Sequence, residues 1–333
     1  MSTRPVVTVI VPGRDVAPYA HAALESLRDQ TLQEWRAILV DDGSTDATTT
    51  IFRDAAKADP RFELIRNERP AGLGAARNVA LDRVETPFVG FLDADDEMTP
   101  AALERLTSTL RETGSDLVAG AYVRLRPDGT GGYVPGTIQP WVSAATAPER
   151  RRTTLAQHPE LSGNIVAWSK VSRIEFWRRH GLRFPEGRLY EDQIVAQQMY
   201  TLARSVDVIP DVVVRWRERA DGSSITQHKD SVTVLTDYVA ALRGGLAVLD
   251  GADQTAAARA RVRLILAMDV PPLIRIAQQH PDPAYRRSVG ALVRELTARA
   301  GAELDTEPAA GSAVDAITVD PDATELRNAA LLW

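Results

Sequence analysis

The sequence is short of several features that mark common protein classes. It has no cysteine, which excludes disulfide bonds, thiolate zinc sites and a cysteine nucleophile. Its 45 acidic side chains exceed its 39 basic ones, giving a formal net charge of −6, which argues against a general nucleic-acid binder. The N-terminus has one early arginine before a β-like run and does not resemble a secretory signal.

Long apolar runs are also absent from the sequence. A membrane-spanning helix needs roughly 20 consecutive apolar residues, and the strongest candidate, residues 264–268, ends at Asp269 and two prolines. We therefore expect a cytoplasmic protein, with peripheral contact at the inner face of the membrane left open. The sequence also leaves open whether the protein forms homo-oligomers. With 44% hydrophobic residues among 333, the chain can bury a sizeable core.

The first 120 residues alternate between strand-like and helix-like segments. Short apolar runs of the kind found in buried parallel strands are each followed by helical periodicity. The predicted strands are residues 6–11, 37–40, 62–65, 87–92 and 116–119. This alternation predicts a mostly parallel α/β sheet with right-handed crossovers. No G-x-G-x-x-G follows the first strand and no G-x-x-x-x-G-K-[ST] occurs, so neither dinucleotide binding nor a P-loop is supported.

The fourth predicted strand ends in an acidic cluster formed by Asp93, Asp95 and Asp96. Ligands of open α/β sheets bind at the carboxyl ends of the strands. Carboxylates this close repel one another unless a cation lies between them, and a hard divalent cation held by one or two carboxylates and by substrate phosphates is the usual solution. The alternative is an acidic helix N-terminus, with Thr99 as the cap.

The second half of the chain predicts a hairpin, further helices and two more strands. The hairpin covers residues 122–134, a helix covers 174–180, another opens at 190–192, and the strands cover 206–209 and 212–216. We interpret the basic triplet Arg150–Arg152 as the solvated face of a helix. A docking surface for an anionic acceptor is the alternative.

From residue 231 onward the composition changes to Ala, Leu and Arg. Helical periodicity predicts helices over residues 234–249, 256–268, 272–279 and 284–300, which we interpret as a small helical subdomain. Residues 302–333 are rich in Gly, Asp, Thr and Pro and predict a loosely packed tail.

Five sequence blocks together resemble inverting nucleotide-sugar glycosyltransferases of family 2, in that family's order and spacing. They are Thr8–Pro12, Val40–Asp46, Gly74–Asn78, Phe91–Asp96 and Tyr190–Asp192. Three further blocks are similar to glycosyltransferase modules of bacterial teichoic-acid and related cell-wall polymer enzymes: Trp168–Lys170, Gly181–Gly187 and Ser224–Gln227.

The resemblance covers about residues 5–227 and implies the domain organisation. We expect a Rossmann-like GT-A glycosyltransferase domain over residues 1–230, with a nucleotide half (1–120) and an acceptor half (121–230). The helical subdomain (231–301) and the tail (302–333) follow it.

The resemblance implies metal-dependent, inverting transfer of a hexosyl or N-acetylhexosaminyl group. The donor would be a nucleoside diphosphate sugar, with UDP favoured, and the acceptor a hydroxyl on a cell-surface polymer or glycan, or on its precursor. Mn²⁺ or Mg²⁺ would stabilise the leaving diphosphate. By the same resemblance Asp95 is the direct metal ligand, and Asp93 contacts the donor and is a weaker metal ligand. Asp96 is expected to cap the following turn.

The acceptor hydroxyl needs a general base, which typically contributes about 10²–10⁴-fold. The resemblance assigns this role to Asp192, with Glu191 supporting its position. The alternative for both carboxylates is an acidic helix N-terminus favoured by the helix dipole.

The resemblance also implies a set of nucleotide and donor contacts. Pro12 and Asp42 match pyrimidine-binding positions, and a carboxylate that accepts a ring N–H favours uracil or thymine over cytosine. Asp15, Asn67 and Arg77 are expected around the nucleotide and the donor; the alternative for Arg77 is a structural ion pair.

Two departures from the family pattern concern the first loop and the metal. The first loop reads Pro12-Gly13-Arg14-Asp15 and lacks the family's aromatic residue. Many relatives have a histidine near the position of Arg217 that completes the coordination of the metal ion. Because this sequence has arginine there, the third protein ligand of the metal is unassigned. His228, the nearest histidine, is expected at the surface. Arg215, Arg217 and Ser224 could instead bind the diphosphate or an anionic acceptor.

Two other functions compete with glycosyl transfer. A nucleotidyltransferase would need a Gly-rich basic loop after the first strand, and Gly13-Arg14 is a poor match. A degenerate module that binds sugar nucleotide or polymer without catalysis is the other alternative.

Overall fold

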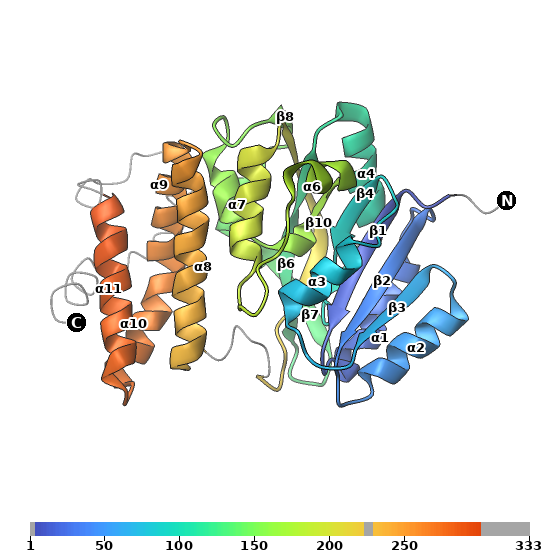
Figure 1. Cartoon of the computed structure of the whole chain (residues 1–333), viewed down its shortest axis with the longest axis horizontal. Helices are drawn as coiled ribbons and strands as arrows, with labels where there is room; N and C mark the ends of the chain where they lie inside the picture. Colours follow the sequence, from blue (N-terminus) through green and yellow to red (C-terminus); the bar gives the residue numbers. More distant parts are fainter. Residues whose placement is uncertain (1–3, 223–228, 301–333) are drawn as a thin grey trace.

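The computed structural model describes residues 4–222 and 229–300, and it consists of a large twisted sheet flanked by helices with a group of helices at one end (Figure 1). The strands in this part of the chain are β1 (Val7–Gly13), β2 (Trp35–Asp42), β3 (Phe62–Asn67), β4 (Phe88–Phe91), β5 (Glu97–Met98), β6 (Leu117–Pro127), β7 (Tyr133–Ile138), β8 (Arg150–Thr153), β9 (Lys170–Arg173) and β10 (Val206–Arg217).

The helices alternate with the first strands and then follow one another at the end of the chain. They are α1 (Ala17–Arg28), α2 (Thr48–Ala58), α3 (Leu73–Leu81), α4 (Ala102–Thr113), α5 (Pro140–Thr146), α6 (Ile174–His180), α7 (Asp192–Leu202), α8 (Val232–Gly251), α9 (Thr255–Leu264), α10 (Val270–Gln279) and α11 (Pro283–Ala300). Two 3₁₀ turns, η1 (Pro159–Gly163) and η2 (Ala167–Ser169), and a π-helical turn, η4 (Ile265–Asp269), lie between them.

The sheet has the order β3-β2-β1-β4-β9-β6-β10-β5, with β7 beside β6 and β8 beside β10. Strands β1 to β4 run parallel, which confirms the predicted α/β sheet, whereas β9 runs antiparallel to both β4 and β6. All seven residues of β1 are buried, as expected of a parallel strand covered on both faces. The carboxyl ends of β1, β2 and β4 therefore meet at one edge of the sheet.

Three local predictions were wrong. The two strands expected over 206–216 are one strand, β10, with a register shift between Ile209 and Val212, because Pro210 lacks an N–H and is accommodated at an irregularity. The triplet Arg150–Arg152 lies in strand β8 and not in a helix, although its side chains are exposed as expected. The helix expected over 256–268 ends in the π-helical turn η4.

The C-terminal helices were predicted and are present. Helix α8 packs on α7, α9 and α11, and α9 packs on η1. By length and composition α8 could span a bilayer, contrary to our reading of the sequence, but 44% of its apolar window is buried inside the protein. A core helix passes the same test, so this composition is weak evidence for a membrane span. Residues 302–333 lie outside the described part of the chain.

Candidate active site

A cavity of about 1030 Å³ opens at the carboxyl ends of β1, β2 and β4 and extends to the C-terminal helices. Asn67 is not in its lining, and Ser224 lies outside the described residues, as does His228. The other nine residues predicted for the site all line it: Pro12, Asp15, Asp42, Arg77, Asp93, Asp95, Glu191, Asp192 and Arg217.

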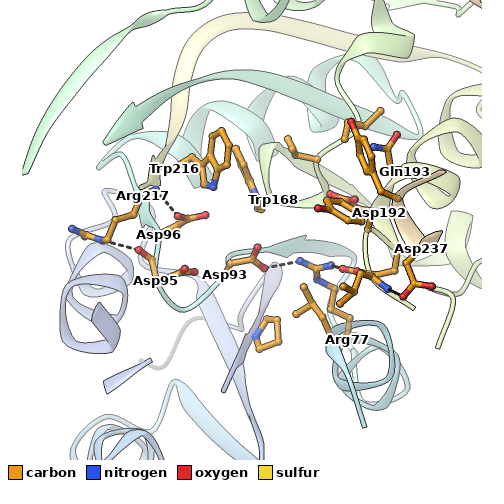
Figure 2. A pocket seen from close by; sticks show the side chains of 18 of the residues that line it. Arg77, Asp93, Asp95, Asp96, Trp168, Asp192, Gln193, Trp216, Arg217 and Asp237 are labelled. Carbon is orange, nitrogen blue, oxygen red and sulfur yellow. Dashed lines mark hydrogen bonds and ion pairs between the residues drawn. The ribbon is translucent and has the colours of Figure 1, made fainter. Parts of the chain in front are cut away.

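Arg77 of α3 connects the two acidic motifs across this cavity. Its Nη2 donates to Asp93 Oδ1 at 2.6 Å (Figure 2). Its Nη1 donates to Glu191 Oε1. The side chain is 1% exposed and lies over the ring of Phe184. Arg77 therefore forms the structural ion pairs that were the alternative interpretation, and because it also lines the cavity, its contact with the donor stays a prediction.

The helix that bears Arg77 packs very closely on the segment before the second acidic motif. A Cβ atom added at Gly74 would lie 2.1 Å from the carbonyl oxygen of Pro185. Asn78 donates to the carbonyl of Phe184 and to Glu186, both at 2.9 Å. The Gly74–Asn78 block thus holds residues 184–186 in place, and these lead into Glu191.

Asp192 is the first residue of α7 and faces the cavity. Burial raises the pKa of its carboxyl group to about 7, and the neighbouring charges of Glu191 and Asp93 act in the same direction. Arg77 and Lys170 act in the opposite direction but do not cancel the effect. A carboxylate with a pKa near the working pH suits general base catalysis.

Lys170, which the sequence indicated only as part of the Trp168–Lys170 block, is a buried cation close to Asp192. It is 2% exposed, and its Nζ donates to Asn164 O at 2.8 Å, to Asn164 Oδ1 at 2.9 Å and to Val166 O. Burial lowers the pKa of this ammonium group to about 7, with Asp192 opposing the shift. Lys170 therefore fixes residues 164–166, and Ile165 and Val166 line the cavity.

The loop before Asp192 is held from the C-terminal helices. Asp237 of α8 accepts from Arg188 Nη1 at 3.0 Å and from the backbone N–H of Leu189 at 3.2 Å. Tyr190, with φ of 59°, has a left-handed backbone that an L-residue adopts at a cost. Asp237 was missed from the sequence because it lies outside the family motifs.

If the chain has the transferase activity that the family resemblance implies, we expect Asp237→Asn to lower its turnover, because Asp192 follows the loop that Asp237 holds. Since small misplacements of a catalytic group can cost up to about 10²-fold, we expect kcat to fall roughly tenfold. Steady-state kinetics would measure this. Thr236→Ala, an exposed neighbour on the same helix, is the control and should change nothing. Equal losses in both variants would contradict a role for the Asp237 contact.

The first acidic motif is tied to the end of β10. Asp95 Oδ2 accepts from Arg219 Nε at 2.8 Å, and Asp96 Oδ1 accepts from the backbone N–H of Arg217 at 2.7 Å. The Arg217 side chain donates to the carbonyl of Asp95 and pairs with Glu97. Asp96 does not cap the following turn as expected; it joins this loop to β10. Burial raises the pKa of Asp95 and raises that of Asp96 well above its usual value.

The nucleotide end of the cavity is built around Asp42 at the end of β2. Its Oδ1 accepts from Asn67 Nδ2 at 2.8 Å and from Ala71 N at 2.9 Å, and its Oδ2 accepts from Gly72 N at 2.8 Å. A carboxylate has roughly four acceptor sites, so three such bonds leave capacity for one ring N–H. Asn67 thus positions Asp42 without lining the cavity itself. Asp15, with φ of 50°, accepts from the backbone N–H of Thr45.

The metal was assigned to Asp95 and Asp93. Within residues 4–222 and 229–300, no three His, Asp or Glu side chains converge as a metal-binding group. Both aspartates line the cavity, and a set of one or two carboxylates completed by phosphate and water oxygens suits Mg²⁺ or Mn²⁺. The residues therefore fit a cation that arrives with a phosphorylated substrate. A third ligand is not found in the described part of the chain.

Comparison with known proteins identifies related sequences. Residues 8–170 match the model of the family described as Glycosyl transferase family 2. An uncharacterized glycosyltransferase of Bacillus subtilis, EpsJ, is 28% identical over 229 residues, which are 68% of this chain and 65% of EpsJ. Glycosyltransferase GlyA of Streptococcus pneumoniae is 29% identical over 64% of this chain and 30% of its own length. The match thus spans less than two thirds of both relatives.

Other similarities concern a cell-wall enzyme and solved structures. The teichoic acid poly(glycerol phosphate) polymerase of Staphylococcus epidermidis is 39% identical over 97 residues, which are 29% of this chain and 14% of that protein. The crystal structure of S. aureus TarS 1-349 in complex with UDP-GlcNAc aligns with a TM-score of 0.69 and 20% identity, over 88% of this chain and 82% of that one. This likeness confirms the GT-A fold.

Proposed function

We propose that this protein transfers a sugar from a nucleoside diphosphate sugar to an acceptor hydroxyl with inversion at the anomeric carbon, because residues 8–170 match the model of glycosyl transferase family 2. The observation that carries the proposal is Asp192, a carboxylate with a pKa near 7 that shares one cavity with the aspartates after β4. Arg77 bridges the two motifs by pairing with Asp93 and Glu191, which supports their joint action on one donor.

The donor is proposed to be a UDP-sugar that carries a hexosyl or N-acetylhexosaminyl group. Pro12 and Asp42 line the nucleotide end, and the remaining acceptor capacity of Asp42 suits the ring N–H of uracil. A solved structure with the same fold contains UDP-GlcNAc, which makes that compound the first donor to test.

The proposed reaction is one displacement step. Asp192 accepts the proton of the acceptor hydroxyl, the hydroxyl oxygen forms a bond to the anomeric carbon, and the bond from that carbon to the diphosphate oxygen breaks. The products are the glycoside, UDP and a protonated Asp192, which returns its proton to water. Attack from the face opposite the leaving group inverts the configuration, so an α-linked donor gives a β-linked product.

The residues proposed to hold the divalent cation are Asp95 and Asp93. When bound, Mn²⁺ or Mg²⁺ stabilises the charge that develops on the leaving diphosphate. Arg219, which pairs with Asp95, and Arg217 add fixed positive charge at the same end of the cavity. Arginine suits this task because its planar group matches phosphate oxygens.

The acceptor is proposed to be a cell-surface polymer or glycan, or its precursor, since one related sequence is named for teichoic acid synthesis. Such an enzyme would work in the cytoplasm, at the inner face of the membrane.

Calorimetric titration of UDP with Mn²⁺, with Mg²⁺ and with a chelator tests the donor site and the metal together. We expect micromolar binding that weakens when the metal is removed. Transfer should fall at least roughly 10²-fold with the chelator, because a Lewis acid contributes several kcal/mol. Full activity in the chelator would show that arginines replace the cation. Absence of UDP binding in every condition would refute the proposed donor, and pyrophosphate release from a nucleoside triphosphate would instead indicate a nucleotidyltransferase.

A further inference from the structure

The C-terminal helices form one wall of the cavity, although they lie beyond the residues that match the family model. Leu264, Met268 and Pro272 are four residues apart and are partly buried in this wall. A Cβ added at Gly163 would lie 2.9 Å from Leu264 Cδ2, so the turn η1 packs directly on α9. Met268 lies within the π-helical turn η4, and such turns are frequent at functional sites.

Aromatic side chains line the same half of the cavity. The rings of Tyr122 and Trp168 lie 4.8 Å apart, and those of Trp168 and Trp216 lie 6.4 Å apart. Figure 2 shows Trp168 and Trp216 side by side between Asp96 and Asp192. Trp141 lines the cavity as well. Trp168 is only 4% exposed and Tyr122 only 6%, whereas Trp141 and Trp216 are half-buried. Trp141 and Trp216 therefore supply the aromatic surface of the cavity, and such surface suits partly apolar, partly hydroxylated ligands such as sugar rings.

Three arginines that line this half of the cavity have partners within the protein. Arg188 pairs with Asp237 at 3.0 Å. Arg261 donates to the side-chain oxygen of Gln193 at 3.0 Å and lies 3.9 Å from Asp269.

Arg124 follows the same pattern, since it lies 3.7 Å from Glu218 and over the ring of Trp216. Each of these three arginines thus lies beside an acidic side chain, so they offer an anionic polymer little uncompensated positive charge.

We propose that the acceptor is an uncharged saccharide, not an anionic polyol phosphate chain. This rests on the proposed function and narrows its acceptor. The sugar that receives the new bond lies against Trp216 near Asp192, and the rest of the saccharide extends along Leu264, Met268 and Pro272. Acceptor choice is thereby set by the C-terminal helices, and donor chemistry by the acidic motifs.

The test is binding of the full chain, with saturating UDP and Mn²⁺, to an array of neutral oligosaccharides, acidic oligosaccharides and glycerol phosphate or ribitol phosphate oligomers. We expect binding to neutral saccharides. Binding only to acidic saccharides or polyol phosphates would overturn the inference, and so would binding to no neutral saccharide. UDP titration reports separately on the proposed function: if UDP does not bind, that function fails, whereas UDP binding without a neutral acceptor refutes only this inference.

Two variants locate the binding on the proposed wall. Trp216→Ala removes an aromatic face, and Met268→Arg adds a charge to the apolar strip. Each should weaken binding of the best neutral saccharide roughly tenfold, the equivalent of ~1.4 kcal/mol. Gln278→Arg adds the same charge at an exposed position of α10 and should leave binding unchanged. Unaltered saccharide binding by both wall variants would overturn the assignment.

Discussion

Asp192→Asn is expected to lower kcat by about 10²–10⁴-fold, the typical contribution of a general base. Asparagine has nearly the same shape but cannot accept the proton of the acceptor hydroxyl. Steady-state transfer and UDP titration on the same preparation would separate loss of catalysis from loss of donor binding. Glu175→Gln is the matched control, since Glu175 is an exposed acid in the first turn of α6. If Asp192→Asn retained near-normal transfer, Asp192 would be only a helix N-terminal acid.

The pH dependence of the wild-type enzyme follows from the same residue. Burial raises the pKa of Asp192 to about 7, so the carboxylate is largely protonated below that pH and largely ionised above it. The base is active when ionised, so kcat/KM should fall as the pH drops below about 7. The residual kcat/KM of Asp192→Asn should not show this fall at low pH, because the titrating group has been removed.

Arg77→Met is expected to cause the largest loss of stability. Breaking a buried ion pair by removing one partner typically costs about 3–5 kcal/mol, because the remaining charge is left uncompensated in a low-dielectric environment. Here the variant would leave both Asp93 and Glu191 without their shared cation. Urea unfolding would measure the change in the free energy of unfolding.

Arg83→Ala is the control for this experiment. Arg83 is 52% exposed and pairs with Glu63 at the surface, and such pairs contribute about 0–1 kcal/mol. The loss of stability in Arg77→Lys should lie between the losses in Arg77→Met and Arg83→Ala, since one ammonium group cannot reproduce the two-sided contact of a guanidinium group. A loss of less than about 1 kcal/mol in Arg77→Met would mean that the bridge does not stabilise the fold.

The nucleotide half of the fold could be predicted from the sequence because parallel strands buried on both faces read as continuous apolar runs. The run that became β1 is the clearest case, since each of its residues is buried. Prediction failed where a single residue interrupts the pattern. Pro210 divided β10 into two predicted strands, whereas the sheet continues past it with a shift in register.

The motif residues of the site could be found from the sequence, but their partners could not. The family blocks indicated Asp93, Arg77 and Glu191, yet the ion-pair bridge between them joins residues more than a hundred positions apart. Asp237 and Lys170 act through contacts with loops that only the folded chain brings near. Asp237 lies in no sequence block, and the block that contains Lys170 does not reveal its partners, because both roles depend on the tertiary packing.

The most direct test of the central proposal is the configuration of the first product formed. Slow hydrolysis of UDP-GlcNAc by the enzyme, followed by proton NMR faster than mutarotation, reports which anomer of the sugar is released when water takes the place of the acceptor. A single displacement with Asp192 as the base predicts the β-anomer from the α-linked donor. Initial release of the α-anomer would contradict the inverting mechanism.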